Sequence, residues 1–206
     1  MNQLFHIDST SYSVERRSVL LELMNKKIVI TGSPGVGKTT LIEALRKNGH
    51  KCYDEPARKI LNSQLEIDGP ALPSKSPQAF IEEMLKDIEE NYTNFRNDEV
   101  SVFFDRAFPD LYMYCSVFKV DPIILSDFEK KFIYNKIVFI LPVWKDIFVN
   151  DVLRKMPFED SFMRQEEIIK AYDRLGYNLI EVPKAKVSER VDFILSKCGL
   201  KSNISK

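Results

Sequence analysis

Cysteines are few in this sequence, and they lie far apart. Cys52, Cys115 and Cys198 are the only three in 206 residues. An odd number of widely separated cysteines does not suggest a disulfide framework, and no Cys-x-x-Cys spacing indicates a zinc site. We expect all three to be small buried apolar side chains in a protein of the reducing cytoplasm.

Long apolar runs are also absent. The chain has no stretch of about 18 uninterrupted apolar residues, as a membrane-spanning helix would require. Its first residues, MNQLFHIDSTSYSVERR, are polar and acidic where a signal peptide would have a basic start and an apolar run. We therefore expect a protein that is not exported and has no membrane partner.

The chain carries no excess of charge of either sign. Its 30 basic and 30 acidic residues give a formal net charge of zero, and the basic residues are spread along the sequence. A protein that holds nucleic acid neutralises many phosphates, so we expect no nucleic-acid partner. A small anionic ligand needs only a local positive site.

What the sequence does contain is an alternation of apolar runs and amphipathic segments. This pattern is typical of a parallel sheet with helices on both faces. We predict an α/β fold with three αβα layers and strands at 27–31, 51–54, 100–105, 136–141 and 178–182. The predicted domain covers 26–199, after a leader at 1–25 with a short helix near 14–24 and before a polar tail at 200–206.

Two helices and one loop are predicted most directly. A helix over 38–48 ends at Asn48-Gly49, because glycine tolerates the left-handed conformation that follows many helices. Apolar residues recur at helical spacing over 80–95. The segment DGPALPSKSP at 68–77 is too rich in Gly, Pro and Ser for regular structure, so we predict a loop, placed where it can border a substrate pocket.

The segment GSPGVGKTT follows the first strand and matches Gly-x-x-x-x-Gly-Lys-[Ser/Thr], the Walker A pattern of a P-loop. The glycines permit close approach of the backbone to a phosphate, and the helix that begins near Lys38 directs its unpaired amides toward the anion. Nucleotide contacts are predicted for Gly32, Ser33, Pro34, Gly35, Val36, Gly37, Lys38, Thr39 and Thr40. The dinucleotide fingerprint Gly-x-Gly-x-x-Gly fits less well.

A nucleoside triphosphate requires a metal ion, and the motif supplies one ligand through the hydroxyl of Thr39. The expected second ligand is an acidic residue at the end of another strand. Asp105 ends the apolar run VFF and would lie beside the loop at the same edge of the sheet. We predict a Mg²⁺ site at Thr39 and Asp105.

Two further segments carry a family resemblance. Asp105-Arg106, in FFDRAFPD, is similar to the Asp-Arg pair of thymidylate-kinase-like enzymes, and Glu55-Pro56, in CYDEPARKIL, is similar to the Glu-Pro segment of deoxynucleoside kinases. With LPVWKDIFVNDVLRK and LGYNLIEVPKAKVSERVDFIL, the chain resembles over 27–196 a P-loop family of predicted ATPases and kinases. That family includes the ribosylnicotinamide kinase domain of NAD-biosynthesis regulators and the AAA domain of TRP-translocation-defect proteins.

The resemblance implies a kinase-like fold with a lid, here at about 145–164, that brings positive charge to the γ-phosphate. Arg154 stands at the position of the family's lid arginine, and Lys155 and Arg164 are further candidates. Arg106 is implied to act with Asp105 in catalysis. Pro183, after the fifth strand, corresponds to the backbone that passes the adenine ring; the guanine motif Asn-Lys-x-Asp has no match in NKIV at 135–138.

Glu55 is the residue that the resemblance implies as general base for an acceptor hydroxyl. Asp54 is an alternative for that role or for the metal, and Arg58 can hold an acidic part of the substrate or form a surface ion pair. We predict an ATP-dependent kinase that phosphorylates a small hydroxyl-bearing, nucleoside-like acceptor. The alternative is a regulatory ATPase that hydrolyses slowly and reports its nucleotide state to a partner. The acceptor and the oligomeric state stay open.

Overall fold

The computed structural model describes residues 26–95, 100–149 and 156–201. Five parallel strands form its central sheet in the order β2-β3-β1-β4-β5. The strands are β1 (Lys27–Thr31), β2 (Lys51–Tyr53), β3 (Val102–Asp105), β4 (Ile137–Ile140) and β5 (Asn178–Glu181). The prediction of five parallel strands is confirmed, and no strand end differs from it by more than two residues.

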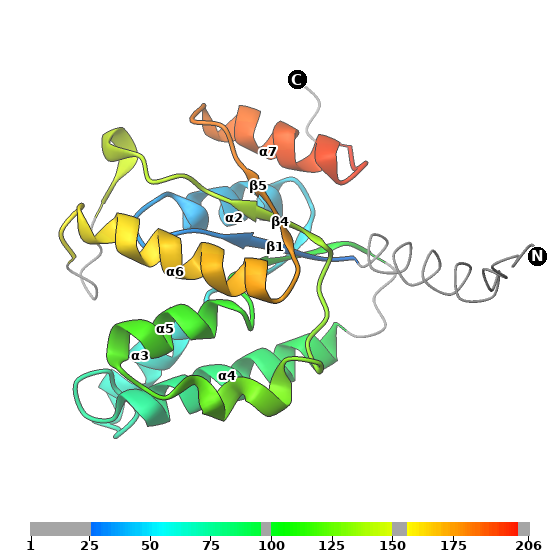
Figure 1. Cartoon of the computed structure of the whole chain (residues 1–206). Helices are drawn as coiled ribbons and strands as arrows, with labels where there is room; N and C mark the ends of the chain where they lie inside the picture. The colour runs from blue at the N-terminus through cyan, green and yellow to red at the C-terminus, as the bar shows by residue number, and fades with distance from the viewer. Residues whose placement is uncertain (1–25, 96–99, 150–155, 202–206) are drawn as a thin grey trace, which may run out of the picture.

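Helices cover both faces of the sheet (Figure 1). One face is covered by α2 (Lys38–Lys47) and α7 (Val187–Lys197). The other is covered by α3 (Pro56–Glu66), α4 (Pro77–Asn94), α5 (Asp110–Phe118) and α6 (Asp160–Arg174). The predicted α/β fold with three layers is therefore confirmed.

The strand β1 shows why the sheet is buried on both sides. Ile28 and Ile30 pack into the apolar cluster under α2 and α7, whereas Val29 packs into the cluster on the opposite face. All three side chains are almost completely buried. A strand whose alternate residues face two covered surfaces is apolar throughout, as the run Ile-Val-Ile is here.

Short signals in the sequence set the ends of two helices. The helix α2 ends at Lys47, one residue before the predicted end; Asn48 is its C-cap, and Gly49 follows with a φ of 83°. Ser76 caps the start of α4, and Pro77 occupies the first turn of that helix. The loop predicted at 68–77 thus ends one residue earlier, at Ser76.

Two short 3₁₀ segments complete the described structure, η1 (Pro122–Phe128) and η2 (Lys145–Ile147). The predicted lid at 145–164 begins with η2, and its last five residues belong to α6. Residues 150–155 of the lid, the leader at 1–25 and most of the tail lie outside the described residues.

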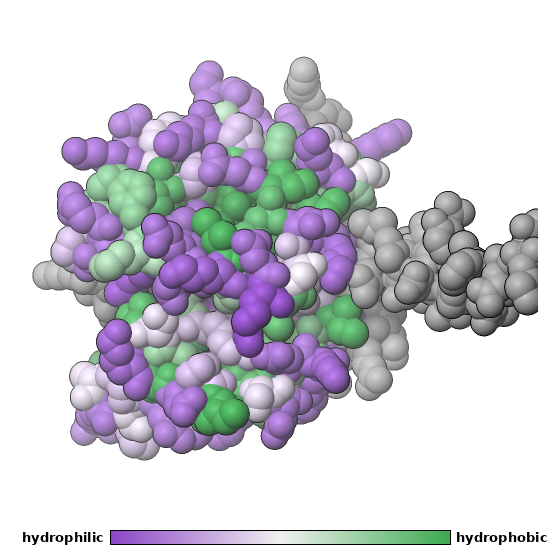
Figure 2. Space-filling model, in the orientation of Figure 1, coloured by the Kyte–Doolittle hydropathy of each residue, from purple (hydrophilic) through white to green (hydrophobic). Residues whose placement is uncertain are grey.

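The surface on the side seen in Figure 1 is mostly hydrophilic, and hydrophobic residues gather there only in small groups (Figure 2). None of the helices in the described ranges has the length and apolar character needed to cross a membrane.

The three cysteines are free thiols. Cys115 is buried, and Cys52 and Cys198 are half-buried. Burial raises the pKa of Cys52 and of Cys115 to about 11 and that of Cys198 to about 12. Such thiols stay protonated at neutral pH, which agrees with the prediction of apolar packing rather than reactivity.

Candidate functional site

The glycine-rich loop joins the end of β1 to the start of α2, as the sequence predicts. A Cβ atom at Gly32 would lie 2.8 Å from the carbonyl oxygen of Leu141, and one at Gly35 would lie 2.7 Å from the ring of Phe148. Both glycines have positive φ angles, of 139° and 79°. Only glycine fits at these positions, because neighbouring segments pack directly on the loop.

Lys38 places its ammonium group on the loop itself. Its Nζ atom donates hydrogen bonds to the carbonyl oxygens of Gly32, at 2.9 Å, and Ser33, at 2.8 Å. The lysine side chain is buried, whereas Thr39 and Thr40 in the first turn of α2 are exposed. The loop therefore combines a fixed positive charge, the amino end of a helix and two accessible hydroxyl groups, which together suit an anion.

Gln165 on α6 supports the loop from a distant part of the chain. Its Nε2 atom donates to the carbonyl oxygen of Leu141 at 2.9 Å, and its Oε1 accepts a hydrogen bond from the backbone amide of Ser33 at 2.8 Å. This glutamine therefore links the start of the loop to the end of β4. No local pattern in the sequence indicates this role.

Asp105 lies beside the loop, as predicted, because β3 pairs with β1 and brings Asp105 opposite Ile30. Its side chain is 3% exposed, and Oδ1 is buried without a hydrogen-bond partner in the described parts of the chain. Burial raises the pKa of this carboxyl group to about 7, although the nearby Lys38 ammonium acts in the opposite direction. A buried carboxylate oxygen without a donor suits a cation.

Arg106 follows in a left-handed conformation, with a φ of 71°. This angle is uncommon outside glycine and turns the side chain inward from the end of the strand. Nε donates to Oε1 of Glu55 at 3.0 Å, and Nη1 donates to Oδ1 of Asp110 at 2.8 Å. Nη2 is buried without a partner among the described residues. The arginine thus binds two carboxylates, and the two N–H groups of Nη2 stay without an acceptor among the described residues.

Glu55 immediately precedes α3, whose first residue is Pro56. The residue before a proline is pushed out of the helical region, which directs Glu55 away from the helix. Besides the bond from Arg106, Oε1 accepts a hydrogen bond from the hydroxyl of Tyr114 at 3.0 Å. The glutamate is 7% exposed. The structure therefore brings Glu55, Arg106 and Asp105 together.

Asp54, the alternative to Glu55, lies elsewhere. Its side chain is 73% exposed and forms an ion pair with Arg46 of α2 at 2.6 Å. Adjacent residues leave a strand end in different directions, and here only Glu55 turns into the protein. Of the two acidic residues, the geometry favours Glu55 for a role at the site.

Asp110, in the first turn of α5, links Arg106 to three further groups through hydrogen bonds. It is 1% exposed and accepts hydrogen bonds from Thr31 Oγ1 at 2.5 Å, Ala107 N at 2.9 Å and Tyr172 OH at 2.6 Å, besides that from Arg106. We did not predict this residue from the sequence. No helical pattern indicates it, because Arg106 lies before the start of α5.

A cavity of about 380 Å³ opens between the loop and α3, α4, α5 and α6. It is lined by Pro34, Ala57, Leu61, Leu65, Leu72, Pro73, Ser74, Phe80, Tyr114, Phe118, Met156 and Arg164. The segment 72–74 belongs to the predicted loop at 68–77. Pro34 places the phosphate loop at one border of the cavity, and Tyr114 connects the cavity to Glu55.

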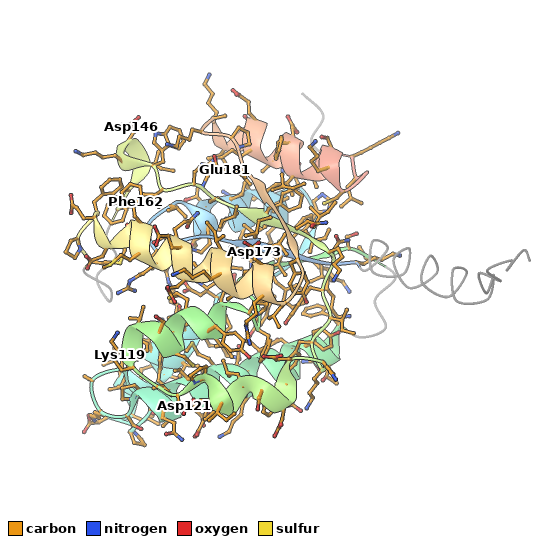
Figure 3. All side chains as sticks on the ribbon, viewed as in Figure 1. Lys119, Asp121, Asp146, Phe162, Asp173 and Glu181 are labelled. Carbon is orange, nitrogen blue, oxygen red and sulfur yellow. The ribbon has the colours of Figure 1, made fainter. Side chains whose placement is uncertain are left out.

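Of the other residues predicted for the site, Arg164 lines the cavity from the first turns of α6, and Arg58 is half-buried on α3. Pro183 is exposed, two residues after the end of β5. Arg154 and Lys155 lie outside the described residues. Figure 3 labels Asp146 on η2, Glu181 at the end of β5 and Phe162 on α6.

Comparisons with solved structures identify similar folds at low sequence identity. A NadR protein in complex with NR matches with a TM-score of 0.68 and 16% identity, over 98% of this chain and 62% of that chain. The NadR protein in complex with NAD and AMP-PNP gives 0.65 and 15%, over 98% and 59%. The chain thus spans about three fifths of the length of these NadR chains.

A second protein of known structure matches over nearly its whole length. The deoxyadenosine kinase from M. mycoides with bound dCTP has a TM-score of 0.53 and 14% identity, over 84% of this chain and 98% of that chain. No curated protein matches the sequence.

The family comparison covers most of the chain. A family model described as an AAA domain matches residues 27–190, which include the phosphate loop, Glu55, the Asp105-Arg106 pair and the start of α7. The similar solved structures share the overall fold of this chain. The chain therefore belongs to this AAA domain family and has a P-loop kinase-like fold.

Proposed function

We propose that the protein is an ATP-dependent phosphotransferase that uses Mg²⁺ and phosphorylates a hydroxyl group of a small, nucleoside-like molecule. One observation carries the proposal. A single cavity is bordered by Pro34 of the phosphate loop and by Tyr114, whose hydroxyl binds the buried carboxylate of Glu55. An acceptor in this cavity would have a phosphate donor on one side and a proton acceptor on the other.

The residues beside the loop fit a magnesium ion. Asp105 offers a buried carboxylate oxygen without a donor, and Thr39 offers an exposed hydroxyl at the start of α2. No cluster of three or more His, Cys, Asp or Glu side chains suited to a metal occurs in the described ranges. This agrees with Mg²⁺ held by one or two side chains together with nucleotide phosphates. When bound, the ion would neutralise charge on the phosphates.

Glu55 would act as the general base. The hydrogen bonds from Arg106 and from Tyr114 to Oε1 fix the orientation of this carboxylate. The acceptor's hydroxyl proton would pass to the Glu55 carboxylate as the oxygen attacks the γ-phosphorus, and ADP would leave. Because the site is buried, water would compete poorly with the acceptor.

Lys38 and the amides at the start of α2 would hold the phosphates, since phosphoryl transfer depends mainly on positioning and electrostatic stabilisation. Arg164, at the cavity wall, would add positive charge near the transferred group, as would Arg154 from the lid. The backbone around Pro183 would contact the adenine ring.

The similar structures support a nucleotide at this site. One NadR structure contains AMP-PNP and NAD, another contains NR, and the deoxyadenosine kinase contains dCTP. The similar structures do not identify the acceptor of this chain. The acceptor would be selected by the cavity, which is lined mainly by apolar and aromatic side chains.

An unbiased screen tests the proposal. The purified protein with Mg²⁺-ATP would be incubated with a metabolite library, and products 80 Da heavier than a library member would be sought by mass spectrometry. ATP-dependent phosphorylation of an alcohol, lost in Glu55→Gln, is the expected result. ATP hydrolysis without transfer to any member would instead favour the regulatory ATPase.

A further inference from the structure

Arg190 lies on the buried face of α7, which is otherwise apolar. The buried face of α7 consists of this residue with Val191, Ile194 and Leu195, which pack under the sheet. Arg190 is only 5% exposed. Arginine is almost never buried to this extent unless its charge is paired, so the position calls for an explanation.

The guanidinium group of Arg190 has no counter-ion in the part of the chain described. Nε is buried without a hydrogen-bond partner, and no side-chain hydrogen bond or ion pair of this residue is found in the described ranges. Burial lowers the pKa of Arg190 below its usual value. Arginine nevertheless stays protonated in proteins, so its positive charge is not compensated by any of the described residues.

The tip of this side chain lies against the phosphate loop. A Cβ atom at Gly37 would be 3.4 Å from Nη1 of Arg190 and 3.3 Å from Cδ1 of Ile147 in η2. Gly37 is the residue that precedes α2, where the unpaired amides of the helix begin. Figure 1 shows the amino end of α7 and η2 at the same end of the molecule. The guanidinium group of Arg190 therefore lies beside the amino end of α2, where the phosphate loop suits an anion.

We propose that Arg190 binds the phosphates of the nucleotide and supplies, with Lys38, a second fixed positive charge at the loop. This inference rests on the nucleotide binding of the proposed function and extends it to a residue from the far end of the domain. A phosphate would compensate the buried charge, whereas a neutral purine ring stacked on the guanidinium would leave it uncompensated. The ligand group is therefore an anion rather than the base.

Arg190→Met is the variant that tests this, because methionine is a flexible apolar side chain that suits the apolar face of α7. Isothermal titration calorimetry would measure the affinity for Mg²⁺-ATP and for inorganic tripolyphosphate, which has no base. We expect both affinities to fall by about tenfold or more, as for loss of a charge-assisted contact. Lys197→Met, which removes one positive charge from the exposed side of the same helix, should leave both unchanged.

Thermal unfolding without ligand separates binding from a structural role. Removal of a buried charge without a partner should raise the unfolding temperature of the Arg190→Met protein above that of the wild type. If Arg190 instead stabilised the fold, the Arg190→Met protein would unfold at a lower temperature than the wild type. A higher unfolding temperature together with a smaller stabilisation by tripolyphosphate is the expected combination.

Three results would overturn the inference. Unchanged tripolyphosphate affinity in a folded Arg190→Met protein would refute the phosphate contact and leave the proposed function intact. Loss of ATP affinity with unchanged tripolyphosphate affinity would assign Arg190 to the base instead. Absence of ATP binding by the wild type would overturn this inference together with the proposed function.

Discussion

Arg106 donates a hydrogen bond from Nε to Oε1 of Glu55 at 3.0 Å, and both side chains are almost completely buried. The pair joins the end of β3 to the start of α3, two elements separated in the sequence by the whole of α4. A general base must be correctly oriented before the reaction, and the bond from Arg106 fixes the position of the Glu55 carboxylate.

Glu55→Gln should lower turnover with an acceptor about 100-fold or more, the usual size of a general-base contribution, while ATP affinity stays nearly intact. The glutamine Oε1 can still accept the bonds from Arg106 and Tyr114, so the fold should persist. Steady-state kinetics and calorimetry measure the two quantities. Asp54→Asn, one residue away and exposed, is the matched control. Equal turnover in the Glu55 and Asp54 variants would refute the base assignment.

Lys38→Ala should weaken ATP binding by about 10- to 100-fold, because the ammonium group is a buried charge on the loop. The effect should appear in a kinase and in a regulatory ATPase alike, so this variant tests the site and not the reaction. Lys47→Ala, at the exposed far end of α2, carries the same charge change and should bind normally. Calorimetry with Mg²⁺-ATP compares the two.

Asp110→Ala should lower the free energy of unfolding by about 3–5 kcal/mol, because it leaves a buried arginine and two hydroxyl donors without their acceptor. Asp54→Ala, which removes an exposed ion pair, should lower it by less than about 1 kcal/mol. Urea unfolding followed by circular dichroism measures both changes. Similar values for the two variants would show that the hydrogen bonds of Asp110 contribute little.

The parts of the site that could be predicted from the sequence are those formed by adjacent residues. The phosphate loop needs a strand, glycines at fixed spacing and a helix, all within 27–47, and the structure has this arrangement. Asp105 could be placed next to it because parallel strands end at the same edge of the sheet.

The rest of the site depends on contacts between distant elements. Gln165 reaches the loop only because α6 packs against α5 and β5, and Arg190 reaches Gly37 only because α7 packs on the same face as α2. Neither contact follows from a local pattern. The cavity likewise arises where four helices meet, so its volume and lining require the folded chain.

Ala57→Leu tests the assignment of the cavity to the acceptor. Ala57 is 2% exposed and lines the cavity two residues after Glu55, so a larger side chain there would occupy part of the 380 Å³. We expect the KM for the acceptor to rise by about tenfold or more while ATP affinity is unchanged, since the cavity borders the phosphate loop only at Pro34.

The matched control is Asn62→Leu, which adds an apolar side chain to an exposed position of the same helix. Overpacking could also disturb the position of Glu55, and the two effects differ in kinetics. A filled cavity raises KM and leaves kcat unchanged at saturating acceptor, whereas a displaced base lowers kcat at every concentration. A variant with unchanged KM and kcat would place the acceptor outside this cavity, because a leucine at this position cannot coexist with a ligand that fills it.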